Sequence, residues 1–158
     1  MALTPFRTMT KPTVGNGVSK ADEGDKMVDN FNRAHALEDQ AIYIPLNGAT
    51  ALVAGDKAYW RVPEKYNGGK LVGVAAACKV GSTSGPVVLT AKKGATSMLS
   101  IDVTIDETET DTITSTSPGV IDTANDDLAT GDFIEISVVS PGDSVTYCGF
   151  ELTVRPSA

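Results

Sequence analysis

The stretch Leu99-Ser100-Ile101-Asp102-Val103-Thr104-Ile105-Asp106 decides the fold class, because its apolar and polar side chains alternate. Successive side chains of a strand point to opposite faces, so this pattern predicts a β-strand with one buried face. We expect Leu99, Ile101, Val103 and Ile105 to form a single apolar face toward the core.

The same alternation recurs from about Ala41 to the end of the chain. It predicts inward-facing side chains in five further segments: Ile42, Ile44 and Leu46; Ala58, Trp60 and Val62; Val72, Val74, Ala76, Cys78 and Val80; Ile134, Ile136 and Val138; and Cys148, Phe150, Leu152 and Val154. Turn-forming groups rich in Gly, Pro, Asn and Asp separate these segments. Roughly eight short strands with a turn every ten or so residues are typical of an antiparallel sandwich of the jelly-roll type.

The first forty residues differ from the rest, since they contain Pro and Gly but no alternating apolar run. Residues 25–38 favour one or two helical turns, with Val28 and Phe31 on one face. We therefore expect an extended N-terminal arm with a short helix over residues 1–40, followed by an all-β, jelly-roll-like body over residues 41–158. The arm holds five basic and six acidic residues and is nearly neutral, whereas the body holds eight basic and fourteen acidic residues.

Composition limits the classes of partner. The chain has 158 residues, of which 41% are hydrophobic, and this suits one packed body with an arm. Its net charge of −7 argues against binding nucleic acid or an anionic membrane, so we expect a protein partner. No apolar run approaches the roughly 20 residues that span a bilayer, and the N-terminus lacks a secretion-signal pattern, so we expect synthesis and assembly in the cytoplasm.

Few residues offer catalytic or redox chemistry. His35 is the only histidine, and we expect it to be a contact residue of the arm rather than half of a catalytic pair. Cys78 and Cys148 have no metal-binding spacing and fall on predicted inward faces, which favours buried thiols, although a disulfide stays an alternative. The sequence shows no nucleotide-binding motif, and we expect no cofactor.

Two groups of carboxylates stand out, Asp102 to Asp111 and Asp122 to Asp127. We interpret both as solvated surface. Two alternatives remain: calcium held by Asp122, Asp126 and Asp127, or a glycan hydrolase that uses acids such as Glu107 and Glu109. Aromatic residues make up only 6% of the chain, which is few for a sugar cleft, so we expect no enzyme.

Three stretches carry a resemblance to a known group of proteins: residues 98–110 (Met-Leu-Ser-Ile-Asp-Val-Thr-Ile-Asp-Glu-Thr-Glu-Thr), residues 118–122 (Pro-Gly-Val-Ile-Asp) and residues 130–138 (Thr-Gly-Asp-Phe-Ile-Glu-Ile-Ser-Val). With Trp60-Arg61-Val62-Pro63 and Leu71-Val72-Gly73-Val74, they resemble small tailed-phage virion proteins with a jelly-roll body, over about residues 41–155. Members are capsid decoration, head-fibre or tail-associated proteins. The chain departs from the pattern at residues 140–147, where a Gly-rich turn is expected.

The resemblance implies a capsid decoration (cement) protein that assembles as a trimer and binds the major capsid protein on the outer surface of the virion. Apolar side chains in an arm need a partner to cover them. The predicted contacts are therefore Leu3, Phe6, Met9, Val14, Val18, Met27, Val28 and Phe31. The alternative is a tail or fibre component that binds host surface glycans, for which Tyr66 and Tyr147 are the loop aromatics.

Overall fold

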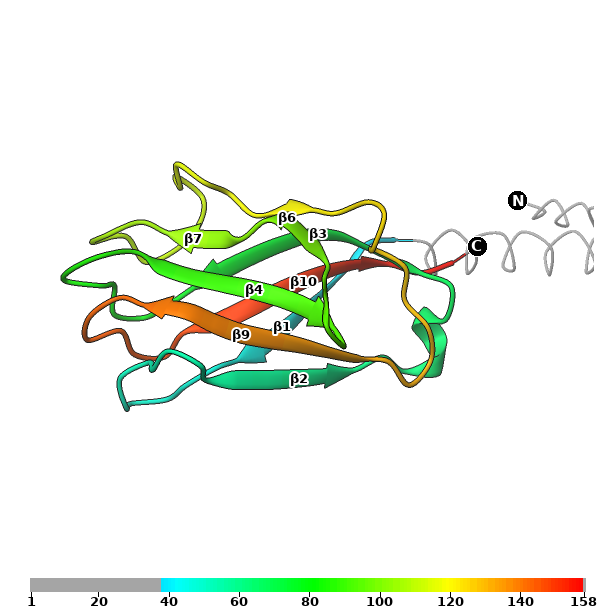
Figure 1. The fold of residues 1–158 in the computed structure, drawn as a ribbon, viewed down its shortest axis with the longest axis horizontal. Coiled ribbons are helices and arrows are strands. Elements are labelled where there is room, and N and C mark those ends of the chain that lie inside the picture. The colour runs from blue at the N-terminus through cyan, green and yellow to red at the C-terminus, as the bar shows by residue number, and fades with distance from the viewer. Residues whose placement is uncertain (1–37, 158) are drawn as a thin grey trace, which may run out of the picture. The chain divides into compact units, whose positions relative to one another are not determined.

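A computed structural model of the chain describes residues 38–157, which form an antiparallel β-sandwich (Figure 1). Its elements are β1 Gln40–Pro45, β2 Lys57–Arg61, the 3-10 helix η1 Glu64–Tyr66, β3 Lys70–Ala77, β4 Val87–Lys93, β5 Thr96–Ser97, β6 Leu99–Ile101, β7 Val103–Ile105, β8 Val120–Ile121, β9 Phe133–Pro141 and β10 Gly149–Arg155. The predicted all-β sandwich is confirmed. Strand β1 begins at Gln40, inside the predicted arm, and residues 1–37 of that arm lie outside the described residues. No helix of the described part is long and apolar enough to cross a membrane.

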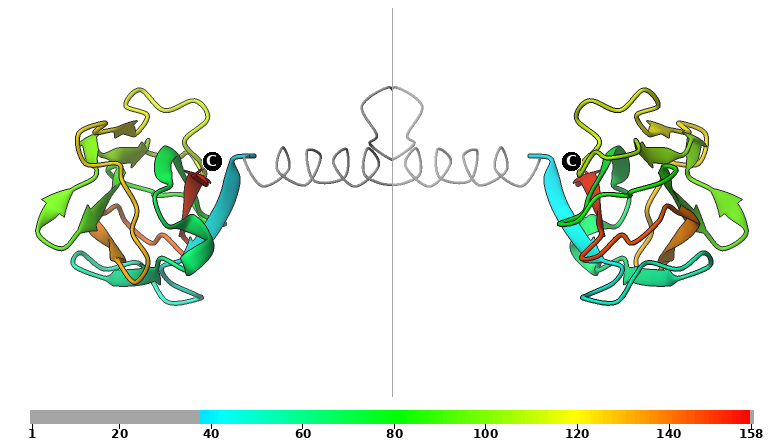
Figure 2. Two further views of the ribbon diagram at one scale, coloured as in Figure 1. Left: turned by 90° about the vertical axis from the view of Figure 1, so that its right-hand side faces the viewer. Right: turned by 90° about the vertical axis from the view of Figure 1, so that its left-hand side faces the viewer.

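Two sheets form the layers of the sandwich (Figures 1 and 2). The back sheet has the strand order β1-β10-β3, and the front sheet has the order β2-β9-β4, with β5 and β7 both paired to β4. Strands β1 to β4 alternate between the two sheets, and β9 and β10 again lie in different sheets. These connections pass over the ends of the sandwich, where the loops gather.

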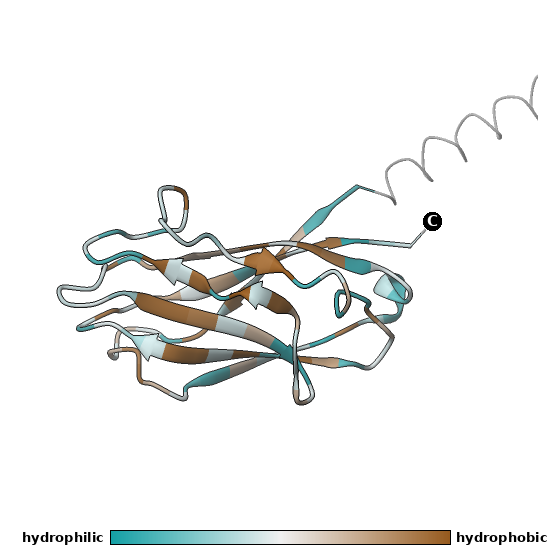
Figure 3. Ribbon diagram, turned by 45° about the horizontal axis from the view of Figure 1, so that its top comes forward, coloured by the Kyte–Doolittle hydropathy of each residue, from teal (hydrophilic) through white to brown (hydrophobic). Residues whose placement is uncertain are grey.

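The core lies between the two sheets and follows the predicted alternation. In β9, Ile134, Ile136 and Val138 are at most 3% exposed, and in β10 Phe150 and Leu152 are fully buried. Trp60 is partly buried and packs against this core, as its parity with the fully buried Val62 predicted. Figure 3 shows that the strongly hydrophobic positions concentrate in the strands.

The apolar face predicted over residues 99–105 is interrupted. Leu99, Val103 and Ile105 are buried, but Ile101 is 49% exposed. The reason is a change of partner at Asp102, since β6 pairs with β8 whereas β7 pairs with β4. The prediction of one continuous inward face is therefore wrong at Ile101.

Strand β3 departs from its predicted parity in a similar way. Its pairing with β10 shifts register between Thr153 and Val154, so that Leu71 is buried to 1% exposure and Val72 is only half-buried. The strand ends at Ala77, and Val80, which lies beyond it, is 45% exposed. Val72 and Val80 are thus corrections to the predicted inward face.

Two polar side chains hold the loop over residues 142–148, which joins β9 to β10. The buried Ser82 Oγ accepts a hydrogen bond from the Asp143 backbone N–H at 2.8 Å. Asn47 Oδ1 accepts one from the Cys148 N–H at 2.6 Å, and Asn47 Nδ2 donates to the Val145 carbonyl at 3.1 Å. These bonds fix the loop on the body, because they satisfy backbone groups that no strand pairs.

Candidate functional site

The eight predicted contact residues lie outside the described residues: Leu3, Phe6, Met9, Val14, Val18, Met27, Val28 and Phe31. The structure therefore leaves their role as a prediction. Within residues 38–157, a groove lies on the outer face of the back sheet. It is lined by Tyr43, Ala75, Ala76, Ala77, Asp111, Thr112, Ile113, Gly149 and Glu151, and has a volume of about 280 Å³.

Small side chains make the floor of this groove. Two cross-strand rows run over the outer face, Tyr43–Glu151–Ala75 and Pro45–Gly149–Ala77. Gly149 has no side chain, and a Cβ there would collide with the Tyr43 hydroxyl, so the Tyr43 ring lies across it. The absence of bulky side chains on β3 and at Gly149 leaves the hollow beside the ring.

The opposite wall is the segment from Asp111 to Ile113. Asp111 forms a bridge with Ala77, and the Ala76 N–H donates to Thr112 Oγ1 at 3.3 Å. The Asp111 carboxylate accepts the Ile113 N–H at 2.9 Å, which closes a tight turn. This turn leaves the Ile113 side chain 87% exposed at the groove.

The groove is apolar with acidic groups at its border. Asp111 and Glu151 both line it, and neither forms an ion pair with any other residue of the described part. An exposed isoleucine beside a tyrosine is covered well by an apolar side chain, and carboxylates pair with Lys or Arg. The groove therefore suits a protein segment that carries both an apolar and a basic residue.

A cluster of polar side chains surrounds Glu135 on the outer face of the front sheet. The Glu135 carboxylate accepts hydrogen bonds from Tyr59 Oη at 3.0 Å and Ser137 Oγ at 2.7 Å, and pairs with Lys57 Nζ at 2.8 Å. The Lys57 ammonium, followed by the Ser137 hydroxyl, lowers the pKa of Glu135 to about 2. The carboxylate is therefore charged across the neutral and mildly acidic range.

The Glu135 cluster should give the body a specific acid sensitivity. Because the folded-state pKa lies below the ordinary value of 4.5, the cluster contributes stability above about pH 4.5 and loses it as the pH falls toward 2. A ¹³C NMR titration should place the Glu135 midpoint near 2, and Lys57→Met should raise it. A midpoint near 4.5 in the unmodified chain would contradict the ion pair.

The two cysteines are buried free thiols, as the inward parity predicted. Cys78 is 8% exposed and Cys148 is fully buried. Burial raises the pKa of Cys78, and it raises the pKa of Cys148 to about 12. A thiol with such a pKa is a poor nucleophile, because only the thiolate reacts.

We expect both thiols to resist modification in the folded protein. At pH 8 a pKa of about 12 leaves only about one Cys148 in ten thousand ionised, and the side chain is also inaccessible. Titration with a disulfide reagent should find almost no reactive thiol in native protein and two after unfolding in guanidinium. Rapid reaction of either thiol in the native state would show that the predicted burial is wrong.

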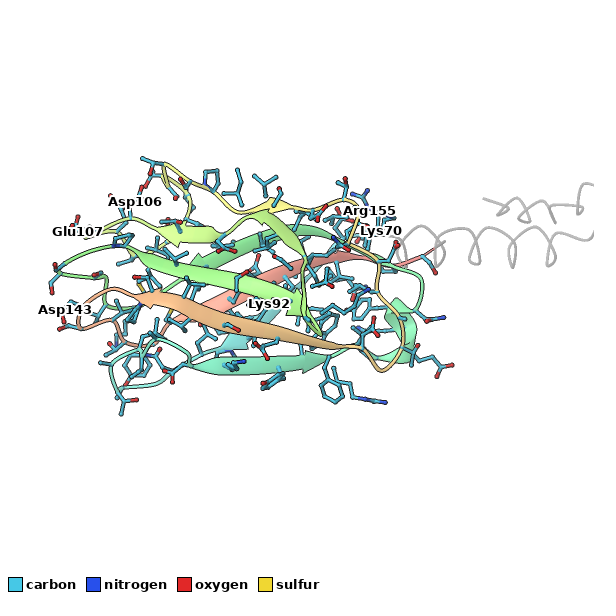
Figure 4. The ribbon with its side chains drawn as sticks, viewed as in Figure 1. Lys70, Lys92, Asp106, Glu107, Asp143 and Arg155 are labelled. Atoms are coloured by element: carbon cyan, nitrogen blue, oxygen red, sulfur yellow. The ribbon has the colours of Figure 1, made fainter. Side chains whose placement is uncertain are left out.

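The carboxylates of the two acidic stretches do not come together as a calcium or hydrolase site within the described residues. Asp126 and Asp127 both pair with Lys70, at 2.8 and 3.3 Å, and Asp122 accepts hydrogen bonds within its own turn. No group of three potential metal ligands occurs among residues 38–157. Glu107 is exposed on the loop after β7, at the end of the sandwich that also carries Asp106 and Asp143 (Figure 4).

The remaining candidates are one histidine and two tyrosines. His35 lies outside the described residues, so its role as a contact residue stays a prediction. Tyr66 was predicted to be a loop aromatic open to a glycan, and this is wrong. It is 3% exposed, packs edge-on against Trp60 at 5.6 Å, and donates to Gln40 Oε1 at 2.6 Å. Tyr147 is 48% exposed.

Comparisons with known proteins identify no relative. No protein-family model matches the chain, and no curated protein and no solved structure is detectably similar to it.

The sequence alone does not predict the groove. Ile113 lies in a Thr-, Ser- and Asp-rich stretch without periodicity, which gives no indication that it borders an apolar hollow. The sequence does place Tyr43 on the outer face of its strand, and it gives Ala75 and Ala77 the outward parity of theirs. Small residues at outward positions of one strand favour close approach by a partner.

Proposed function

We propose that this chain is a phage capsid decoration protein, which binds the outer surface of the assembled head and stabilises the shell. In this proposal the N-terminal residues 1–40 bridge capsomers of the major capsid protein, and the β-sandwich sits above them. The trimeric state is proposed from the resemblance to small phage virion proteins. No cofactor and no catalytic step belong to the proposal.

The groove beside Ile113 is the observation that carries the proposal. A side chain that is 87% exposed and apolar, next to an aromatic ring and a floor of alanines, is more stable when a partner covers it. At about 280 Å³ the groove is smaller than most small-molecule sites and fits one or two protein side chains. Its geometry favours a protein contact over a substrate pocket.

The strand order supports the jelly-roll part of the proposal. In a jelly roll, consecutive strands cross repeatedly between two sheets. Here β1, β2, β3 and β4 alternate between the back and front sheets, and the last two long strands, β9 and β10, lie at the centres of the two sheets. Jelly rolls serve many functions, so this supports the family resemblance and not the function by itself.

Binding to the assembled shell would stabilise it by linkage. A ligand that binds only the assembled state lowers its free energy relative to the dissociated subunits. An extended chain advances about 3.3 Å per residue, so twenty residues span about 66 Å. The arm is thus long enough for the apolar side chains near its start to contact a neighbouring capsomer.

The test uses shells of the encoding virus that were assembled without this protein. The full chain should co-sediment with them, and a full-length variant with Leu3→Ser, Phe6→Ser and Met9→Ser should bind at least about tenfold more weakly, because three apolar contacts are lost. A variant with Thr8→Ser and Thr10→Ser serves as the control and should bind normally. Failure of the unmodified chain to bind shells would refute the proposed function.

A further inference from the structure

The outer face of the front sheet presents two aromatic rings to solvent. Tyr59 of β2 is 58% exposed and Phe133 of β9 is 57% exposed. In the register of these strands, Tyr59 lies opposite Glu135 and Arg61 lies opposite Phe133. The two rings are therefore diagonal neighbours on one face, a spacing across which large side chains can act together.

Tyr59 is held in place. Its hydroxyl donates to Glu135 Oε2 at 3.0 Å, while Glu135 Oε1 binds Lys57 Nζ at 2.8 Å and Ser137 Oγ at 2.7 Å. A solvent-exposed tyrosine normally changes rotamer freely, and these contacts restrain this one. A ligand that stacks on the ring therefore loses less free energy to ordering it.

The same face is basic, although the body is acidic. It carries Lys57, Arg61 and Lys92, which are three of the eight basic residues in the last 121 positions, where there are sixteen acidic ones. Among the strand positions of β2, β9 and β4 on this face, Glu135 is the one acid, and it is paired with Lys57. Arg61 and Lys92 form no ion pair with the described residues, and Figure 4 places Lys92 on the front sheet.

We propose that this front face binds an acidic polysaccharide of the polyuronate type. It is defined by Lys57, Tyr59, Arg61, Lys92, Phe133 and Glu135. The apolar C–H faces of sugar rings pack on Tyr59 and Phe133, and the uronate carboxylates pair with the guanidinium of Arg61 and the ammonium of Lys92. The residues lie side by side on an open sheet, which suits an extended polymer rather than a small enclosed ligand.

The composition of the face favours this occupant over a protein partner. The centres of protein–protein interfaces are depleted of Lys and Glu, whereas Lys57, Lys92 and Glu135 lie among the rings here. Single-stranded nucleic acid carries a similar charge per unit and also stacks on aromatic rings, so the oligonucleotide probe in the experiment below decides between the two polymers. A polyuronate carries one carboxylate on each sugar and also offers an apolar C–H surface on every sugar unit.

The inference is independent of the proposed function. Figures 1 and 2 show that the two sheets form opposite layers of the sandwich. The groove lies on the outer face of the back sheet and the aromatic rings lie on the outer face of the front sheet. Occupation of one face therefore leaves the other open.

Affinity electrophoresis and calorimetry of the full chain test the proposal. The probes are polygalacturonate, alginate, neutral dextran and a single-stranded oligonucleotide. The two polyuronates should bind, and Tyr59→Ala, Phe133→Ala and the pair Arg61→Gln with Lys92→Gln should each weaken binding by about fivefold to tenfold. Tyr43→Ala is the matched control, because Tyr43 is also 58% exposed but lies on the back sheet. It should bind like the unmodified chain.

Three results would overturn the proposal. They are absence of binding to both polyuronates, oligonucleotide binding as strong as polyuronate binding, and binding that Tyr43→Ala weakens as much as Tyr59→Ala. Circular dichroism and urea unfolding of each variant show whether a lost interaction is due to lost folding. The substituted side chains are all on the surface, so the variants should unfold near the midpoint of the unmodified chain.

Discussion

Phe150→Ala should lower the free energy of unfolding by about 3–5 kcal/mol, a large part of the stability of a domain of this size. Phe150 is completely buried in the core, with 0% of its surface exposed to solvent. It lies in the central strand of the back sheet, between Ile44 and Ala76 of the neighbouring strands. Truncation removes the transfer free energy of the ring and leaves a cavity that the flanking strands cannot fill. Urea unfolding followed by circular dichroism measures the loss.

Phe133→Ala is the matched control for that experiment. Phe133 is the same residue type in the central strand of the front sheet, but it is 57% exposed on the outer face. Its truncation should change the free energy of unfolding by no more than about 0.5 kcal/mol. Equal losses for the two variants would mean that the inward and outward faces of the strands are assigned wrongly.

Ile113→Asp should weaken shell binding at least about tenfold while leaving the body folded. The side chain is 87% exposed, so its loss removes almost no buried surface from the isolated protein. In the bound state a new carboxylate would have to lose its hydration beside Asp111 and Glu151, the two acids that already line the groove. Co-sedimentation with shells and urea unfolding measure the two effects separately.

Val139→Asp makes the comparison specific to the groove. Val139 is 54% exposed and belongs to β9 of the front sheet, away from the residues that line the groove. The substitution Val139→Asp introduces the same charge as Ile113→Asp, and it should leave shell binding unchanged. Normal binding by Ile113→Asp would show that the groove is not the contact surface, even if the arm binds.

The sequence predicted the strands whose side chains alternate without interruption. The β9 and β10 core positions follow the expected parity, because each strand lies at the centre of its sheet with one face on the core. The alternation of apolar and polar residues predicted the buried face wrongly where a segment changes its partner strand or its register. Asp102 separates two short strands with different partners, and the shift between Thr153 and Val154 moves β3 out of phase. Such changes depend on which strands pair, and a single strand does not encode that locally.

The two proposed binding surfaces were less predictable than the fold. The polar-face positions of Tyr59 and Glu135 follow from alternation, but their hydrogen bond depends on the β2–β9 register, which joins segments 76 residues apart. The groove forms where three separate segments come together: Ala77 at the end of β3, Gly149 at the start of β10, and Asp111 in a turn without periodicity. No one of these segments indicates the groove by itself. For Tyr66 the sequence predicted an exposed side chain, because turn residues flank it. In the structure the ring is buried against Trp60.

The most direct test of the proposed function is the melting temperature of shells assembled without this protein, measured before and after the full chain is added. The account predicts saturable binding to the shells, a rise in their melting temperature, and much weaker binding to dissociated capsid subunits, because the stabilisation requires the assembled state. An unchanged melting temperature, or equal affinity for shells and free subunits, would contradict it.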